Sequence, residues 1–376
     1  MRIAYVASPP LFSKGASGIH VMKMCQAMAK LGHSVELILP SYNNKIDIYE
    51  YYAVEPIFKL TPLPSLDGLS IRPTVHGFLS SIYTKLKRSN FDLVVTRNIF
   101  YTFISTKLFR IPTIYDAHHP LVNKAAHSLF KSFKESNYLL RFSTNSHGLA
   151  NIYSRLGLPE DKLVVAHNGV DLERFEAAVT KEEARRKLGL PHEKEIVCYS
   201  GNFYPGRGLD LLIDVAEELR HVLFIIVGGT GDDIENYRRR LREREIENFL
   251  LIGFVPHRAV PHYLFASDVL IMPYTSRMTI RDGSVAAEFT SPIKLFEYMA
   301  SGRPIVATAL PSIKEVLEDN RNAILVEPDS AHSVLDGIKK ALSDQVLTQR
   351  IVARAASDIR RYTWEERVKR ILDGLD

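Results

Sequence analysis

Residues 291–304 constrain the fold of this 376-residue chain more than any other stretch, because they predict a helix followed by a buried strand. They read SPIKLFEYMASGRP and continue into the β-branched run IVAT. Ser291 is a good N-cap residue, Pro292 suits the first helical position, and Gly302 is a typical helix stop. A short apolar strand after such a helix is typical of an α/β fold.

Glu297 is the unusual residue of this helix, since its carboxylate stands among apolar side chains. It could lie on the solvated face and pair with Lys294, as many helix carboxylates do. Alternatively, the helix N-terminus could attract a phosphate while Glu297 accepts hydrogen bonds from two sugar hydroxyls. A nucleoside diphosphate carries both groups, and the residues alone leave both interpretations open.

The same stretch resembles the C-terminal signature of the family-four retaining glycosyltransferases, which have the GT-B fold. That fold has two Rossmann-like domains facing across a cleft, with a C-terminal helix that crosses back to the first domain. The resemblance implies that Glu297 holds the ribose of a nucleotide-sugar. The family usually has a second glutamate eight positions earlier, where this chain has Phe289. Glu288, one residue out of register, is the nearest candidate for contact with the donor sugar.

The length of the chain predicts two domains, and its 46% hydrophobic and 24% charged residues are typical of a soluble protein. No apolar run approaches the roughly 18–20 residues that span a bilayer. The first residues, MRIAYVASPP, indicate a strand rather than a signal peptide. Cys25 and Cys198 predict free, buried thiols in a reducing compartment. We therefore expect a cytoplasmic protein.

The charge is unevenly distributed. Residues 1–175 contain 20 Lys and Arg against 12 Asp and Glu, a net charge of +8, whereas the remainder has a net charge of −3. A basic N-terminal half suits an anionic acceptor or an anionic membrane surface, so peripheral association with the inner face of the membrane is one expectation. No helix-turn-helix, zinc-ligand or RNP-like pattern accompanies the charge, and we expect no nucleic-acid partner.

The N-terminal half opens with a strand, a glycine-containing loop, a helix and a second strand, which is the start of a Rossmann-like unit. The loop does not match GxGxxG, which argues against a dinucleotide oxidoreductase. Ser17 and Gly18 stand where the family carries a Gly-Gly pair. The resemblance implies that their backbone N–H groups approach the donor diphosphate, and an ordinary tight turn is the alternative.

A pair of histidines, His118 and His119, follows a predicted strand at 111–115. Ligands bind at the carboxyl ends of parallel strands, and a histidine there can bind a sugar hydroxyl or act at an acceptor. The resemblance implies that His118 contacts the donor sugar or the acceptor, with His119 as its rival. Residues 122–142 then predict a basic, amphipathic helix containing Phe130 and Phe133, which lies on a membrane interface or packs on the domain core.

The C-terminal half begins near the charged segment TKEEARRKLG at residues 180–189. We expect an acceptor-side domain over 1–175, joined by a C-terminal helix of about 359–376 that Trp364 anchors, and a donor domain over 176–358. After a strand at 196–200, the loop GNFYPGRG offers Arg207 as a guanidinium fork for a diphosphate. Asn202 stands where the family has a cation, and Lys294 is the natural substitute.

The resemblance implies further donor contacts, including backbone contacts to the nucleobase. They are Gly253, Phe254, Val255, Ser291, Pro292 and Ile293. The loop at 275–290, with Arg277, Arg281 and Asp282, could close over the donor.

Together these features predict a retaining glycosyltransferase that moves a sugar from a UDP- or GDP-linked donor to a glycan, lipid-linked or small-molecule acceptor. We expect no cofactor and no metal, because no DxD triplet or His/Cys cluster with metal-ligand spacing occurs. A GT-B nucleotide-sugar epimerase is one alternative. A catalytically degenerate nucleotide-binding or scaffold protein is another, and Asn202 and Phe289 are its best support.

Overall fold

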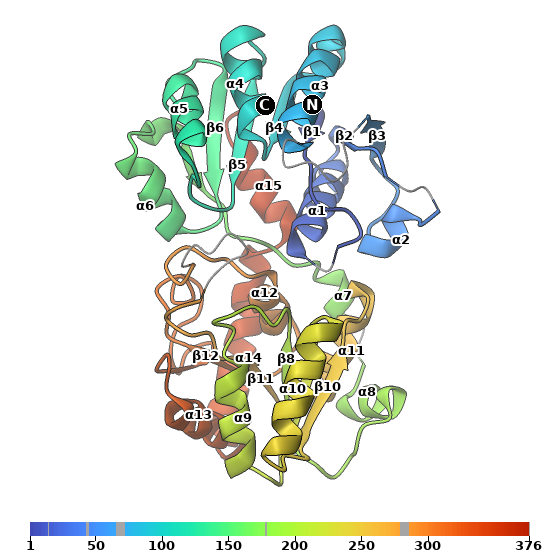
Figure 1. Cartoon of the computed structure of the whole chain (residues 1–376), viewed down its shortest axis with the longest axis vertical. Coiled ribbons are helices and arrows are strands. Elements are labelled where there is room, and N and C mark those ends of the chain that lie inside the picture. Colours follow the sequence, from blue (N-terminus) through green and yellow to red (C-terminus); the bar gives the residue numbers. More distant parts are fainter. Residues whose placement is uncertain (14, 43–44, 65–71, 177–178, 279–285, 376) are drawn as a thin grey trace. The chain divides into compact units, whose positions relative to one another are not determined.

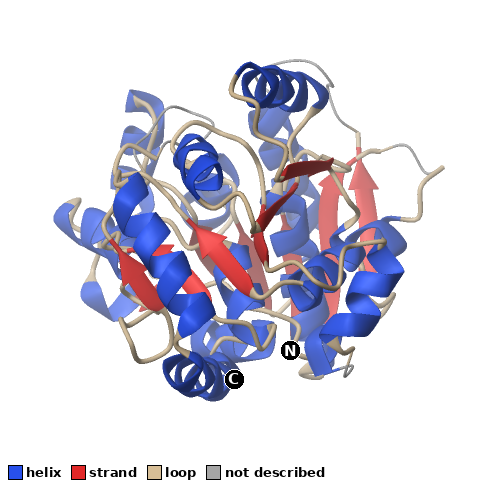
Figure 2. Cartoon of the chain, turned by 90° about the horizontal axis from the view of Figure 1, so that it is seen from below, coloured by secondary structure: helices blue, strands red, loops and turns tan. Residues whose placement is uncertain are grey.

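The computed structural model describes residues 1–13, 15–42, 45–64, 72–176, 179–278 and 286–375, and it forms two compact units. Unit 1 contains Met1–Asn168 and Trp364–Asp376, and unit 2 contains Gly169–Thr363. Each unit has its own parallel sheet flanked by helices (Figures 1 and 2). The predicted class, α/β with two Rossmann-like units, is confirmed. None of the described helices is long and apolar enough to cross a membrane.

The described part of unit 1 forms a seven-stranded parallel sheet in the order β3-β2-β1-β4-β5-β6-β7. The strands are β1 (Arg2–Val6), β2 (Ser34–Pro40), β3 (Lys59–Leu63), β4 (Leu93–Thr96), β5 (Thr113–Ala117), β6 (Leu139–Thr144) and β7 (Leu163–Val165). The α-helices are α1 (Ala16–Lys30), α2 (Ile48–Tyr52), α3 (Arg72–Leu86), α4 (Ile99–Phe103), α5 (Lys124–Phe133), α6 (His147–Arg155) and α15 (Trp364–Leu372). Short 3₁₀ helices, η1 (Arg88–Asn90) and η3 (Glu160–Lys162), and a π-helix, η2 (Ile104–Leu108), accompany them.

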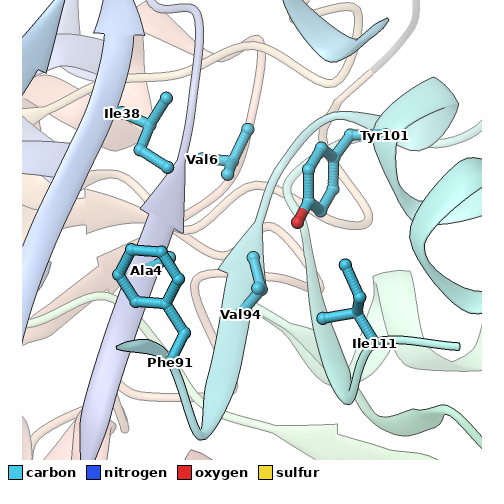
Figure 3. Close-up of a cluster of buried hydrophobic side chains, with 7 residues drawn as sticks. All are labelled: Ala4, Val6, Ile38, Phe91, Val94, Tyr101 and Ile111. Carbon is cyan, nitrogen blue, oxygen red and sulfur yellow. The ribbon is translucent and has the colours of Figure 1, made fainter. Parts of the chain in front are cut away.

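The central strands of unit 1 are continuous apolar runs because helices cover the sheet. Val6 of β1 pairs with Ile38 of β2 and with Thr96 of β4, so the carboxyl ends of these strands lie at one edge. Figure 3 shows part of the core that fixes this register, formed by Ala4, Val6, Ile38, Phe91, Val94, Tyr101 and Ile111. The loops after β1, β4 and β5 are therefore neighbours.

Helix α15 belongs to unit 1, as predicted for the C-terminal helix, and it packs on α1. Trp364 is 2% exposed, and its ring contacts the ring of His20 at a centroid distance of 5.2 Å. The predicted anchoring role of Trp364 is confirmed.

Helix α5 is shorter than the predicted helix, and its aromatic face is buried. Phe130 and Phe133 are 2% and 0% exposed, and Phe130 packs against the rings of Phe142 and Tyr153. Of the two interpretations of this helix, core packing is therefore correct. The membrane-surface interpretation of these two residues is wrong, because their rings are already covered by protein.

The described part of unit 2 forms a six-stranded parallel sheet in the order β10-β9-β8-β11-β12-β13. The strands are β8 (Ile196–Ser200), β9 (Leu223–Val227), β10 (Phe249–Gly253), β11 (Val269–Met272), β12 (Ile305–Thr308) and β13 (Ile324–Val326). The helices are α7 (Glu173–Glu176), α8 (Lys181–Leu188), α9 (Leu209–Glu218), α10 (Gly231–Glu243), α11 (Val260–Ala266), α12 (Ile293–Ala300), α13 (Ala331–Ser343) and α14 (Gln345–Asp358), with turns η4 (His257–Ala259) and η5 (Ile359–Arg361).

Helix α12 begins one residue later than its capping pattern predicted. Pro292 is the N-cap residue, with φ −72° and ψ 131°, and the helix starts at Ile293 without a side-chain cap. The prediction that Ser291 caps the helix is wrong, because Pro292 takes the extended backbone of the cap position. Gly302, with φ +69°, ends the helix region as predicted.

Candidate active site

In unit 2, the loops after β8 and β11 and the first turn of α12 bring two cations to two tyrosine rings. The Nζ atom of Lys294 lies 3.8 Å from the ring centroid of Tyr199 and 5.4 Å from that of Tyr274. The guanidinium carbon of Arg207 lies 4.6 Å from the centroid of Tyr274. The structure therefore brings together the two cations that the sequence singled out, and aromatic faces hold them in place.

Lys294 sits in an environment that disfavours its charged form. Its Nζ atom is buried and has no hydrogen-bond partner among the described residues. Burial lowers the pKa of Lys294 well below its ordinary value, and the charge of Arg207 adds to this effect while Glu297 opposes it. A group with several negative oxygens would satisfy both cations at once.

The loop between β8 and α9 needs glycine for two different reasons. Gly201 has φ +141°, and a Cβ there would lie 2.2 Å from Nζ of Lys294. Gly208 has φ +76°, and a Cβ there would lie 1.7 Å from the carbonyl oxygen of Pro273. Gly201 thus keeps the space that the ammonium group occupies, and Gly208 lets the loop approach the end of β11.

Glu297 is buried, at 5% exposure, and it pairs with residues far from Lys294 in sequence. Its Oε1 lies 2.7 Å from Nε2 of His257 and 4.0 Å from Nη1 of Arg174. Arg174 also donates to the carbonyl oxygen of His257 at 2.6 Å. The solvated-face interpretation of Glu297 is therefore wrong, because the helix turns this carboxylate inward, where His257 fixes it.

The remaining predicted donor contacts of unit 2 lie in varied surroundings. Glu288 is exposed, whereas Phe289 beside it is 4% exposed and belongs to the core. Ser291 is buried, Phe254 is 42% exposed, and the carbonyl oxygen of Gly253 accepts a bond from the N–H of Gly228. The others, Val255, Pro292 and Ile293, are partly exposed.

Of the predicted donor-closing loop, Arg277 is exposed. Arg281 and Asp282 lie outside the described residues.

In unit 1, a pocket of about 110 Å³ lies at the carboxyl ends of β1, β4 and β5. Its lining is Ala7, Ser8, Pro9, Val21, Arg97, Tyr115, Asp116, His118 and His119. Both candidate histidines line it, but they differ in their surroundings. The side chain of His118 is 11% exposed and bonds Asp116, whereas His119 is exposed and bonds the carbonyl oxygen of Pro120.

Asp116 is the centre of a buried network beside this pocket. Nε2 of His118 donates to its Oδ2 at 2.9 Å, and Arg367 of α15 donates to its Oδ1 at 2.6 Å. Burial acts to raise the pKa of Asp116, but Arg367 and His118 outweigh it and hold that pKa well below its usual value. Burial and then the charge of Arg97 lower the pKa of His118 to about 3. Asp116 is therefore ionised and His118 neutral near pH 7.

His20, Asp116 and His118 offer ligand atoms within 4.8 Å of one another, which is a spacing that metal sites use. The charge around them argues against a divalent cation, because Arg367 already balances Asp116 and the charge of Arg97 acts on both histidines. The arrangement suits a neutral imidazole with a fixed tautomer, whose Nε2–H is bound to Asp116.

Ser17 and Gly18 lie in the first turn of α1, inside the helix rather than before it. A Cβ at Gly18 would lie 2.4 Å from the hydroxyl oxygen of Tyr52, so packing against Tyr52 accounts for this glycine. Oγ of Ser17 lies 3.2 Å from Nη1 of Arg97.

Several residues of these clusters were not assigned a role from the sequence. Asp116 could have been found, since residues two apart on a strand share a face and His118 follows it by two. Arg367 and His257 carry no local signal, because their partners lie 251 and 40 residues away.

Comparisons with known proteins agree with these observations. The family model for glycosyl transferases group 1 matches residues 180–358, and the model for glycosyltransferase family 4 matches residues 17–174. An uncharacterized glycosyltransferase of Methanocaldococcus jannaschii is 24% identical over 98% of this chain and 96% of its own length. Phosphatidyl-myo-inositol mannosyltransferase of Mycobacterium leprae is 24% identical over 97% of this chain and 93% of its own.

Solved structures show the same fold. HepE of Anabaena in complex with UDP has a TM-score of 0.77 at 17% identity, covering 100% of this chain and 99% of its own, and HepE is also solved with UDP-glucose. The two units, each with a parallel sheet, and the similarity of the whole chain to HepE define a protein with the GT-B fold. Because the two family models together match most of the chain, it belongs to the family-four, group 1 glycosyltransferases.

Proposed function

We propose that this glycosyltransferase moves a sugar from a UDP- or GDP-linked donor to an acceptor hydroxyl, with retention of anomeric configuration as the family resemblance implies. The bond from the anomeric carbon to the donor phosphate breaks, and a bond to the acceptor oxygen forms. The acceptor proton leaves with the diphosphate, and no metal or cofactor takes part. The observation that carries this proposal is the pair of cations, Arg207 and Lys294, which are held over tyrosine rings.

In this proposal Arg207 and Lys294 bind the diphosphate and stabilise the charge that develops as it departs. The donor phosphate then supplies the partner that Nζ of Lys294 lacks among the described residues. Ser17 and Gly18 contribute backbone N–H groups at the start of α1, which has no acidic residue in its first turn.

Glu297 accepts hydrogen bonds from the ribose hydroxyls. His257 and Arg174 support this role, because their contacts hold the carboxylate in place. Gly253, Phe254, Val255, Ser291, Pro292, Ile293 and Glu288 remain proposed contacts of the nucleobase or donor sugar.

His118 contacts the donor sugar or the acceptor through its neutral ring. The M. leprae relative is a phosphatidyl-myo-inositol mannosyltransferase, which supports a lipid-linked acceptor among the proposed classes. The epimerase alternative has less support, since both matching family models are those of glycosyltransferases. The degenerate-protein alternative has less support because the cation pair and the buried carboxylate are both in place.

The test is nucleotide binding by a Glu297→Gln variant, with the exposed Glu193→Gln of the same unit as its control. Losing hydrogen bonds to a charged group is expected to weaken UDP or GDP binding by about 10- to 100-fold. Calorimetric titration measures the affinity, and Glu193→Gln should bind as the wild type does. Wild-type affinity in Glu297→Gln would refute the ribose assignment, and no nucleotide binding by the wild type would favour a degenerate scaffold protein.

We also propose that unit 1 contacts an anionic membrane through α3 rather than α5. Phe78, Ile82 and Leu86 form an exposed stripe on α3, at 49%, 36% and 81% exposure. Leu108, 61% exposed, adds to the exposed apolar surface of unit 1, and Nζ of Lys85 lies 5.7 Å from the ring of Phe109 beside it. Apolar side chains accompanied by lysines are typical of a membrane-surface contact. We propose the inner face of the membrane, reached from the cytoplasm, as the place of this contact.

A further inference from the structure

The pocket of unit 1 has one positive charge that no neighbouring carboxylate balances. Asp116 and Arg367 cancel each other, since their side chains are 0% and 1% exposed and lie 2.6 Å apart. Burial lowers the pKa values of His20 and His118, so both rings are neutral near pH 7. Arg97, directly after β4, is the remaining charge on the pocket lining.

Arg97 has donors to spare. Its Nη1 lies 3.2 Å from Oγ and 3.5 Å from the carbonyl oxygen of Ser17, and within the described ranges no carboxylate forms an ion pair with it. A guanidinium group carries five N–H donors over three nitrogens. Ser17 engages one nitrogen, which leaves a forked pair of donors for a planar or tetrahedral oxyanion.

The pocket has room for one substituent rather than a whole ligand. At about 110 Å³ it is well below the roughly 300–1,000 Å³ of pockets that enclose small molecules. The side chains of Ser8, His118 and His119 line it together with Arg97, so hydrogen-bonding groups surround the guanidinium. A phosphate or carboxylate group attached to a larger molecule suits this size and charge.

We propose that Arg97 binds an anionic group of the acceptor, a phosphate or a carboxylate, beside His118. The inference rests on the proposed glycosyltransferase function and names the class of its acceptor. A donor diphosphate is the other possible source of an oxyanion. The acceptor is favoured because Arg207 and Lys294 of unit 2 already provide two cations for the diphosphate. The basic balance of residues 1–175 agrees with an anionic acceptor.

The test uses matched probes, namely glucose, glucose 6-phosphate and glucuronate, titrated calorimetrically into the full-length protein at constant ionic strength. Wild type is expected to bind at least one anionic sugar about tenfold or more tightly than glucose. The preferred sugar tells phosphate from carboxylate. Arg97→Met should lose the preference and Arg97→Lys should keep part of it. Arg155→Met, which removes an exposed arginine of α6 in the same unit, should keep all of it.

Three results would overturn the proposal. They are a wild type without preference for either anion, an Arg97→Met protein that keeps the preference, and an Arg155→Met protein that loses it as well. An anionic sugar bound at the cations of unit 2 would give the second result. Circular dichroism and the melting temperature check that each variant is folded. If Arg97→Met does not fold, the comparison of Arg97→Lys with the wild type decides the test.

The source of the anion is decided by nucleotide affinity. If the acceptor supplies it, Arg97→Met binds UDP and GDP as the wild type does, whereas an equal loss of UDP affinity would assign Arg97 to the donor and overturn the acceptor class. Failure of the proposed function looks different. It appears as a wild type that binds no nucleotide, while the sugar titration still reports on the pocket.

Discussion

Lys294 shows how a single residue can be unfavourable in the free protein and useful in the complex. Its ammonium group is buried against Tyr199 and repelled by Arg207, and burial lowers its pKa well below the ordinary value. Functional sites often retain a buried charge that destabilises the free protein, because the bound ligand compensates that charge. If a diphosphate binds here, it raises the pKa of Lys294 again and binding takes up a proton.

The first prediction concerns the pH dependence of this binding. In this proposal the pKa of Lys294 is lower in the free protein than in the complex. UDP affinity should therefore fall as the pH rises from the pKa of Lys294 in the free protein to its pKa in the complex. Titration calorimetry in two buffers of different ionisation enthalpy measures the proton uptake. Lys294→Met should take up no proton, bind about tenfold or more weakly, and melt about 2–4 °C higher.

Lys339→Met, an exposed substitution on α13, is the control and should behave as the wild type in all three measurements. Proton uptake that persists in Lys294→Met would show that another group titrates. An unchanged UDP affinity would remove Lys294 from the diphosphate site.

At the scale of single residues, the sequence predicts which residues of a short motif bind a ligand. It does not predict which residues from distant parts of the chain contact them. Arg207 and Lys294 were paired on motif grounds, and the structure places both over Tyr274. The inward orientation of Glu297 was left open, because it depends on His257. Short motifs specify loops and helix ends, whereas a buried charge pair is specified by the packing of distant elements.

At the scale of elements, α3 was the least predictable from the sequence. Its buried face is polar, made of His76, Ser80, Ser81 and Thr84, and its exposed face carries Phe78 and Leu86. The hydroxyl groups of Ser80 and Thr84 bond His76 and Tyr101, which makes a polar inner face tolerable. The apolar residues that repeat at helical spacing along α3 therefore face away from the core.

Strand β3 lies at the edge of the sheet of unit 1. It contains Pro62, which an edge strand tolerates.

The inverted pattern of α3 leads to a prediction about membranes. Phe78→Ser with Leu86→Ser should reduce binding to phosphatidylcholine vesicles that contain phosphatidylglycerol by about tenfold or more, since each substitution removes buried apolar area. Vesicle co-sedimentation measures the bound fraction. The control is Val346→Ser, which changes an apolar residue of α14 in unit 2 whose 79% exposure is close to that of Leu86.

Binding should also weaken when phosphatidylglycerol is omitted, because Lys85, Lys87 and Lys107 accompany the apolar residues. Wild-type binding that the α3 substitutions leave unchanged would assign the contact to another surface. Absence of vesicle binding by the wild type would refute the membrane proposal and leave the acceptor pocket unaffected.

At the scale of the molecule, the sequence predicted two Rossmann-like units because strand and helix patterns alternate in both halves. The structure gives each unit a sheet and core of its own, with the chain passing from unit 1 to unit 2 after Asn168 and returning at Trp364. The return is needed within unit 1, since Arg367 of α15 balances the buried charge of Asp116. Unit 2 is a continuous segment and contains Arg207, Lys294 and Glu297 with their described partners.

A fragment of residues 169–363 is therefore expected to fold alone and to bind the nucleotide. Its UDP affinity should lie within about threefold of that of the full chain. The reason is that the fragment contains the three charged side chains proposed to bind the diphosphate and the ribose, Arg207, Lys294 and Glu297. Circular dichroism, thermal melting and calorimetric titration test the fragment, and its Glu297→Gln variant should lose the binding. A folded fragment that fails to bind UDP, when the full chain does bind it, would show that unit 1 supplies an essential part of the nucleotide site, with Ser17 and Gly18 as the first candidates.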